Sequence, residues 1–133
     1  PLEKEIKMIR NYMALEKIRY AEQMQMIIDI EGNPGEKMIA PLLLIPFVEN
    51  AFKHISHRTD KNNFVHLDLR RSNGQFEFTV ENSKENGITE TEQHGGIGLN
   101  NVKRRLELLY PGRYKLDIEN SPDTFTIIFK LKI

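Results

Sequence analysis

The chain has 133 residues, and its 19 lysines and arginines balance 19 aspartates and glutamates, so the formal net charge is zero. This size predicts one domain, and the neutral balance argues against nucleic acid or an anionic membrane surface as the main partner, because both reward clustered positive charge. The absence of cysteine excludes disulfides and cysteine-ligated metal. No apolar run is long enough to span a bilayer, and the start at Pro1 leads us to expect a part of a longer protein.

The first thirty-five residues predict a helix and then a strand. Apolar residues recur at helical spacing over 2–18, which predicts a helix that ends within 21–24. Over 24–30 the apolar period becomes two, so one face of a strand is apolar. The Gly-Asn-Pro-Gly sequence at 32–35 predicts the turn that ends this strand.

A second helix is predicted from Pro41 to His57, with a kink at Pro46 because proline removes one backbone hydrogen bond. On a helical wheel one side is apolar and consists of Leu44, Phe47, Val48, Ala51, Phe52 and Ile55. The opposite side carries Asn50, Lys53 and His54. We therefore expect these three polar side chains to face outward together.

Every remaining strand is apolar on one face and mostly polar on the other. The remaining elements are strands at 65–69 and 76–80, a polar loop over 83–96, a helix over 99–110, and strands at 114–118 and 125–133. Asn73-Gly74 predicts the turn of the first hairpin, and Pro111-Gly112 ends the helix. The fold class is therefore α/β (α+β): a two-layer sandwich whose mixed, mostly antiparallel sheet of about five strands is covered by helices on one face.

The polar side of the 41–57 helix carries groups suited to a metal and a polyphosphate. The amide oxygen of Asn50 is a good ligand for Mg²⁺, which takes few protein oxygens beside phosphates and water. Lys53, one turn further along, can meet a phosphate, and His54 lies on the same side. The same three residues are also compatible with an ordinary solvated helix face.

A glycine-rich segment, 95–99, opens directly into the 99–110 helix. Glycine permits close backbone approach to a ligand, and a helix N-terminus favours anions. An ordinary flexible loop ending in a helix cap explains the segment equally well when it is taken alone. Two such elements in one small domain favour a nucleotide site.

Several stretches resemble sensor histidine kinases. Asn50, within Glu-Asn-Ala-Phe-Lys-His at 49–54, resembles the N box of their ATP-binding domain, and Gly96-Ile97-Gly98-Leu99 resembles the second glycine box. Segments 12–20, 41–46 and 96–106, with Tyr110 shortly after, are similar to the LytS/YehU-like branch. The resemblance covers essentially the whole chain.

This resemblance implies a Bergerat (GHKL) fold over a single catalytic domain, 1–133. The domain would use ATP and Mg²⁺ as a protein histidine kinase and present the γ-phosphate to a histidine outside the chain. Residues 1–24 would lead from a dimerisation and phosphoacceptor segment of the same kinase. A response regulator would be the later partner, and the full-length protein would be a homodimer attached to a bacterial inner membrane, with this domain in the cytoplasm.

The resemblance also assigns roles to individual residues. Asn50 would hold Mg²⁺ and Lys53 would contact phosphate, and these two with Glu49 would be the catalytic residues. His54 would join Asn50 and Lys53 in binding ATP. The backbone of Gly96, Ile97, Gly98 and Leu99 would surround the triphosphate. The 83–96 stretch would be the ATP lid.

Two positions depart from the family pattern. Asn82 stands where an aspartate accepts the adenine amino group; its register places it on the inward face of the strand, and a neutral amide makes a weaker bond. Hydrolytic members of the superfamily carry a water-activating glutamate one turn before the metal asparagine, where this chain has Pro46. Glu49 points about 100° away around the helix, so a kinase is favoured over an ATPase.

A non-catalytic alternative stays open at this point. Asn82 is also compatible with a degenerate nucleotide-binding fold that signals by protein interaction without catalysis. None of the four histidines, His54, His57, His66 and His94, lies in a phosphoacceptor motif. We therefore expect that the isolated chain does not phosphorylate itself.

Overall fold

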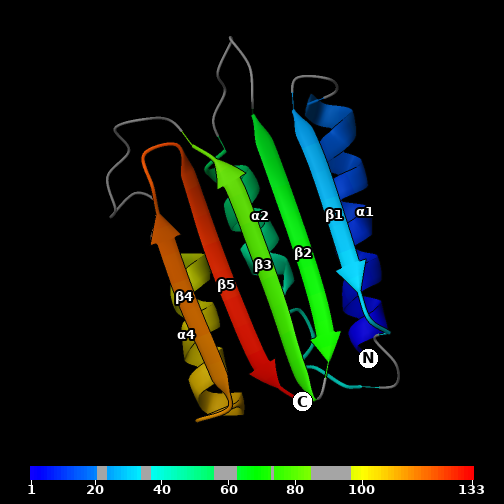
Figure 1. Ribbon diagram of the computed structural model, residues 1–133, viewed down its shortest axis with the longest axis vertical. Coiled ribbons are helices and arrows are strands. Elements are labelled where there is room, and N and C mark those ends of the chain that lie inside the picture. The colour runs from blue at the N-terminus through cyan, green and yellow to red at the C-terminus, as the bar shows by residue number, and fades with distance from the viewer. Residues whose placement is uncertain (21–23, 34–36, 56–62, 73, 85–96) are drawn as a thin grey trace.

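The structure is a computed structural model that describes residues 1–20, 24–33, 37–55, 63–72, 74–84 and 97–133. Within these ranges, three helices and five strands are arranged as one sheet with helices beside it (Figure 1). They are α1 (Leu2–Tyr20), β1 (Gln25–Glu31), α2 (Ile45–Lys53), β2 (Phe64–Ser72), β3 (Gln75–Ser83), α4 (Ile97–Leu109), β4 (Tyr114–Asn120) and β5 (Thr124–Lys132). The expected lid falls mostly on residues 85–96, which lie outside the described part.

The strands form one sheet in the order β1-β2-β3-β5-β4. β1 pairs with β2 in parallel, and the other neighbours are antiparallel. A parallel pair needs a crossover connection, and α2 lies in the segment that joins β1 to β2. Helix α2 packs on the central strands, because the Phe47 ring centroid lies 6.4 Å from that of Phe78 of β3 and 5.5 Å from that of Phe129 of β5.

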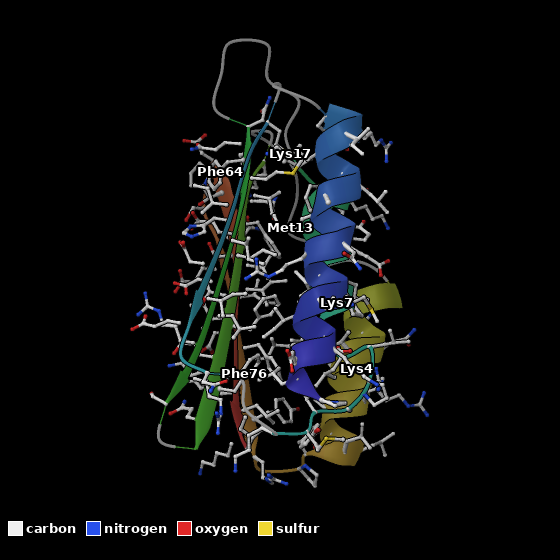
Figure 2. All side chains as sticks on the ribbon, turned by 90° about the vertical axis from the view of Figure 1, so that its right-hand side faces the viewer. Lys4, Lys7, Met13, Lys17, Phe64 and Phe76 are labelled. Atoms are coloured by element: carbon white, nitrogen blue, oxygen red, sulfur yellow. The ribbon has the colours of Figure 1, made fainter. Side chains whose placement is uncertain are left out.

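The helices cover one face of the sheet, as Figure 2 shows with the sheet edge-on. Alternate residues of the strands point to that face, and the largest fully buried side chains include Phe47, Phe76, Phe78, Phe125 and Phe129. Phe47 of α2 packs against the sheet, with its ring centroid 5.5 Å from that of Phe129. The predicted two-layer sandwich with a one-sided sheet is confirmed.

Helix α2 is shorter than predicted at its start. The prediction that the helix begins at Pro41 and is kinked at Pro46 is wrong, because residues 41–44 form turns and the helix begins at Ile45. Pro46 therefore lies in the first turn, where its missing N–H removes no intrahelical hydrogen bond. The predicted end at His57 is also wrong, because the helix ends at Lys53 and the His54 backbone N–H donates a 3.1 Å capping bond to the Asn50 carbonyl oxygen.

The end of β3 also differs from the prediction. Ser83 belongs to the strand and is fully buried, and its hydroxyl accepts a 2.9 Å hydrogen bond from the Phe64 backbone N–H. Lys84 is buried too, donating from its backbone N–H to the Asp123 carbonyl oxygen at 2.9 Å and from Nζ to the Asn120 side chain. These tertiary bonds extend the ordered strand into a stretch that looks like loop from its polarity alone.

Candidate functional site

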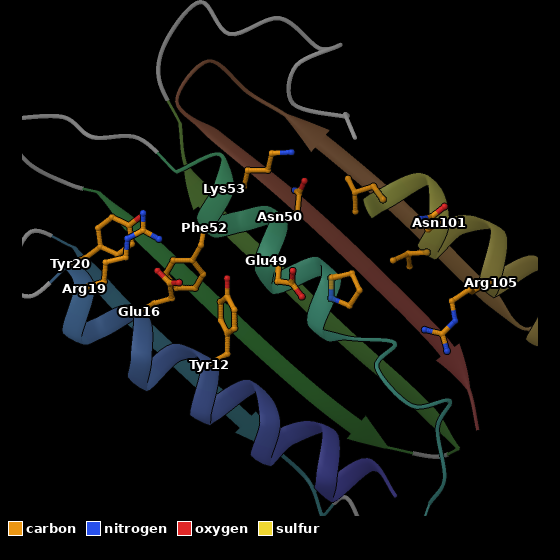
Figure 3. Close-up of a pocket in the computed structure, with 13 residues that line it drawn as sticks. Tyr12, Glu16, Arg19, Tyr20, Glu49, Asn50, Phe52, Lys53, Asn101 and Arg105 are labelled. Atoms are coloured by element: carbon orange, nitrogen blue, oxygen red, sulfur yellow. The ribbon is translucent and has the colours of Figure 1, made fainter. Parts of the chain in front are cut away.

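A cavity of about 760 Å³ lies between α1, α2 and α4, on the side of the helices that faces away from the sheet (Figure 3). It is lined by Tyr12, Glu16, Arg19, Tyr20, Pro46, Glu49, Asn50, Phe52, Lys53, Leu99, Asn101, Val102 and Arg105. The cavity thus brings the predicted N-box residues next to the start of the helix that follows the glycine-rich segment.

Asn50 is the buried polar residue of the cavity. It is only 9% exposed, and its Nδ2 atom has no hydrogen-bond partner among the described residues. The sequence predicts an outward-facing Asn50, whereas the structure places it in the wall of a cavity formed with α4. A buried donor without a partner costs about 1–3 kcal/mol, so this amide suits a ligand that supplies an acceptor.

Lys53 and Glu49 lie on the same helix and line the same cavity. Both are exposed, so the cavity mouth carries a cation one turn after Asn50 and a carboxylate immediately before it. Figure 3 shows Asn50 and Lys53 on the side of α2 that faces away from α1. Helical spacing alone separates Glu49 from Asn50 by about 100°, yet the cavity extends around α2 far enough to include both.

His54 and Asn82 are not among the residues that line the cavity. Asn82 is 1% exposed and faces inward, as its register predicts. Its Nδ2 atom donates to the Ser83 carbonyl oxygen at 2.9 Å and to the His54 carbonyl oxygen at 3.5 Å. In this structure Asn82 therefore links the end of β3 to the end of α2.

The glycine-rich segment is described only from residue 97 onward. Helix α4 begins at Ile97, so Ile97, Gly98 and Leu99 form its first turn, and Gly96 lies outside the described residues. Leu99 is buried and lines the cavity. The first N–H groups of a helix have no intrahelical partner and favour anions, which gives this side of the cavity an anion-binding character.

The α1 wall of the cavity was missed by sequence reasoning. Tyr12 and Tyr20 flank Phe52 of α2, with ring centroids 5.7 Å and 6.3 Å from it. Glu16 contributes a buried Oε2 atom without a hydrogen-bond partner in the described chain, and Arg19 lies over the Tyr20 ring at 5.5 Å. The resemblance of residues 12–20 to the kinase family was the only sign in the sequence that α1 belongs to the site. The helical period of α1 predicts only which of its residues pack into the core.

Charge in the cavity is distributed unevenly. Burial raises the pKa of the Tyr12 phenol above its usual value, and the nearby carboxylates of Glu16 and Glu49 raise it further. The phenol therefore stays protonated at neutral pH beside two acidic groups. Lys53, at the end of α2, adds a positive charge that would favour a polyphosphate, whereas the Arg105 guanidinium donates to the carbonyl oxygens of Pro41 and Leu42.

A metal at this site would need ligands beyond the protein. Among the described residues, no group of three or more histidine, aspartate or glutamate side chains could hold a metal ion. Mg²⁺ commonly binds through one or two protein oxygens and completes its shell with phosphate oxygens and water. The single amide of Asn50 fits a metal that arrives with a nucleotide.

Comparison with curated proteins finds sensor histidine kinases along nearly the whole chain, although no protein-family profile matches it. YesM of Bacillus subtilis (strain 168) is 25% identical over 130 residues, which cover 96% of this chain and 22% of YesM. BtsS of Escherichia coli (strain K12) is 27% identical over 125 residues, or 93% of this chain and 22% of BtsS. A LytS of Staphylococcus epidermidis (strain RP62A) is 25% identical over 137 residues, or 95% of this chain and 23% of LytS. The chain thus spans less than a quarter of each of these relatives.

Solved structures with the same fold are histidine kinase catalytic domains. The catalytic domain of ThkA matches with a TM-score of 0.64 and 17% identity, over 95% of this chain and 90% of that domain. The histidine kinase domain of the Erythrobacter litoralis blue-light activated kinase matches with a TM-score of 0.65 and 18% identity, over 92% of this chain and 58% of that domain. None of the helices in the described ranges is long and apolar enough to cross a membrane. The relatives of this chain are thus sensor histidine kinases, LytS among them, and its fold is that of histidine kinase catalytic domains.

Proposed function

We propose that this chain binds Mg²⁺-ATP and presents the γ-phosphate to a histidine on a segment outside residues 1–133. The observation that carries this proposal is Asn50, whose buried Nδ2 atom has no hydrogen-bond partner in the described part of the chain. Asn50 lines one cavity with the Lys53 cation and with Leu99 of the first turn of α4. A hydrogen-bond donor, a cation and the start of a helix around one cavity suit a polyphosphate.

Each residue has a distinct role in this site. The Oδ1 atom of Asn50 would be a ligand of Mg²⁺, its Nδ2 would donate to a phosphate oxygen, and Lys53 would neutralise phosphate charge. Mg²⁺, when bound, neutralises the negative charge that develops on the transferred phosphoryl group. The backbone from Gly96 to Leu99 would surround the triphosphate, and Asn82 and His54 would lie toward the adenine end.

The residues near Asn50 in the helix favour phosphoryl transfer to a histidine over hydrolysis of ATP. Pro46 lines the cavity one turn earlier and has no basic group that could activate water. Glu49 is exposed at the cavity mouth, where it could accept a proton from an incoming imidazole. We therefore assign Glu49 to the transfer step and not to nucleotide binding.

Partners follow from the same role. A solved structure contains the histidine kinase ThkA in complex with the response regulator protein TrrA, and 99% of this chain matches that kinase with a TM-score of 0.65. We propose a response regulator as the later partner of this chain, and the phosphoacceptor segment of the same kinase as the first. A homodimeric, membrane-attached bacterial kinase with residues 1–133 as its single cytoplasmic catalytic domain remains our prediction.

The alternative is a degenerate module that keeps this fold without binding nucleotide. It is favoured by Asn82, whose Nδ2 atom is already bonded to two backbone carbonyl oxygens and which lies outside the cavity lining. One titration separates the two functions, because only the kinase requires saturable binding of nucleotide.

The test is calorimetric titration of the chain with a non-hydrolysable ATP analogue and Mg²⁺. We expect saturable binding that Asn50→Ala removes and that Asn11→Ala leaves unchanged, because Asn11 is exposed on α1 and lies outside the cavity lining. Absence of heat at millimolar nucleotide would favour the degenerate module. Phosphate accumulating on the isolated chain would contradict a phosphoacceptor outside it.

A further inference from the structure

Residues 40–44, which run directly into α2, are held by a buried carboxylate of α1. The Oε1 atom of Glu5 accepts hydrogen bonds from the backbone N–H groups of Leu43 at 3.1 Å and Leu44 at 3.4 Å. Its Oε2 atom accepts another from Leu42 at 3.1 Å. Glu5 is buried, and none of its three donors lies within thirty-five residues of it along the chain. The start of α2 is therefore tied to α1 by one side chain.

Helix α4 holds the same segment from the other side. The guanidinium of Arg105 donates to the carbonyl oxygens of Pro41 at 2.8 Å and Leu42 at 3.2 Å. The Tyr110 hydroxyl, just beyond α4, accepts a 2.9 Å hydrogen bond from the Ala40 backbone N–H. Because Arg105 also lines the cavity, the 40–44 segment connects all three helices that form the cavity walls.

A small tilt at the start of α2 produces a displacement of more than an ångström at Asn50, in the proposed nucleotide site. Asn50 lies five residues after Ile45, or about 7.5 Å along the helix axis, so a tilt of about 10° at the start of α2 moves it by about 1.3 Å. Displacements of about 1 Å in a reacting geometry can change rates by about a hundredfold. Leu42, at the centre of the segment, has a φ of 60°, a strained conformation for leucine that the surrounding bonds maintain.

We propose that the 40–44 segment is a pivot between α1 and the nucleotide site, with Glu5 and Arg105 as positioning residues. A shift of α1 carries Glu5 with it, moves the start of α2, and changes where Asn50 and Lys53 lie relative to α4. Arg105 holds the α4 side of the same pivot. This inference rests on the proposed function, because the quantity that the pivot controls is the affinity for Mg²⁺-nucleotide.

Calorimetric titration with the non-hydrolysable ATP analogue and Mg²⁺ tests this proposal when thermal unfolding of the same samples is measured without nucleotide. We expect Glu5→Gln, at a residue outside the cavity lining, and Arg105→Gln to weaken the affinity about tenfold or more while the proteins stay folded. A loss in Arg105→Gln alone would overturn the pivot, because Arg105 itself lines the cavity. The matched controls Arg104→Gln and Glu3→Gln, exposed residues beside them on the same helices, should bind as the wild type does. Arg105→Lys should restore part of the affinity, because an ammonium can still donate to one of the two carbonyl oxygens.

The possible results separate this proposal from the proposed function. Lower melting temperatures with unchanged affinity would show that Glu5 and Arg105 only stabilise the fold, and would overturn the pivot. If the wild type binds no nucleotide, the proposed function fails, and the pivot is then tested by NMR. Backbone amide shifts at Asn50 and Lys53 that are larger in Arg105→Gln than in Arg104→Gln would support it, and equal shifts would overturn it.

Discussion

The segment just before α2 is bonded to both neighbouring helices, whereas the last turns of α2 border the cavity and carry a polar atom without a partner among the described residues. Glu5 and Arg105 satisfy backbone groups ahead of α2 with five hydrogen bonds. The Nδ2 atom of Asn50, five residues after the helix begins, has no hydrogen-bond partner among the residues that the structure describes. The contrast agrees with our proposal that a ligand supplies the missing partner at the end of α2 that borders the cavity.

The largest effect on stability is expected from truncating Phe47, the side chain that packs α2 against the sheet. Phe47→Ala deletes a fully buried ring between α2 and the sheet and should lower the free energy of unfolding by about 3–5 kcal/mol. Urea unfolding followed by circular dichroism measures it. Leu108→Ala is the control, because Leu108 is 74% exposed and its truncation should change stability by less than about 0.5 kcal/mol. Equal effects of the two changes would contradict the described packing of α2.

Removing the Glu5 carboxylate, which holds the segment before α2, should clearly lower the free energy of unfolding. Glu5→Ala leaves three backbone N–H groups near the start of α2 without their acceptor and should cost about 2–3 kcal/mol of unfolding free energy. Glu3→Ala, at an exposed position of the same helix, should cost much less. Similar losses from both variants would mean that Glu5 does not hold the segment.

Substitution of Asn50, at the end of α2 that borders the cavity, should raise the stability of the nucleotide-free protein. Asn50→Leu replaces a buried amide, whose Nδ2 has no partner among the described residues, with an apolar side chain of similar size. We therefore expect stability without nucleotide to rise by about 1 kcal/mol. Stabilisation by Mg²⁺-nucleotide should disappear in the same variant. Thermal unfolding with and without the ATP analogue measures both effects, and a strongly destabilised variant would instead assign Asn50 to the fold.

The smallest effect is expected in the pH dependence of stability, through Tyr12 in the α1 wall of the cavity. The pKa of the Tyr12 phenol is raised in the folded chain above its ordinary value of 10.0, chiefly by burial and then by Glu16 and Glu49. The associated stability is complete below the ordinary pKa and is lost as pH rises through the folded value. Wild-type protein should therefore lose more stability than Tyr12→Phe above about pH 10. Parallel losses in urea unfolding would mean that Tyr12 is not in this buried, acidic setting.

Much of the fold could be predicted because strand faces follow from alternation alone. Val65, Leu67 and Leu69 on β2 and Phe76 and Phe78 on β3 are buried as their period requires. The start of α2 could not be predicted from its own residues. It depends on Glu5, nearly forty positions earlier, which satisfies the N–H groups before Ile45.

The candidate site was only partly visible in the sequence. The N-box resemblance named Asn50 and Lys53, and the second glycine box named Leu99, and these three residues do line one cavity. Glu16 and Arg105 have no local pattern that distinguishes them from surface charges on amphipathic helices. Only the packing of α1 and α4 around α2 brings them to the cavity.

The sequence by itself determined which residues face the core and which family this chain resembles, because both depend on short-range spacing along helices and strands. Tertiary structure alone decided that Asn50 is buried, that His54 and Asn82 lie beside one another outside the cavity lining, and that α1 forms part of it. The physical reason is that burial and hydrogen-bond partnership depend on neighbours far away in the chain. For Asn50 those neighbours come from a helix that begins at Ile97.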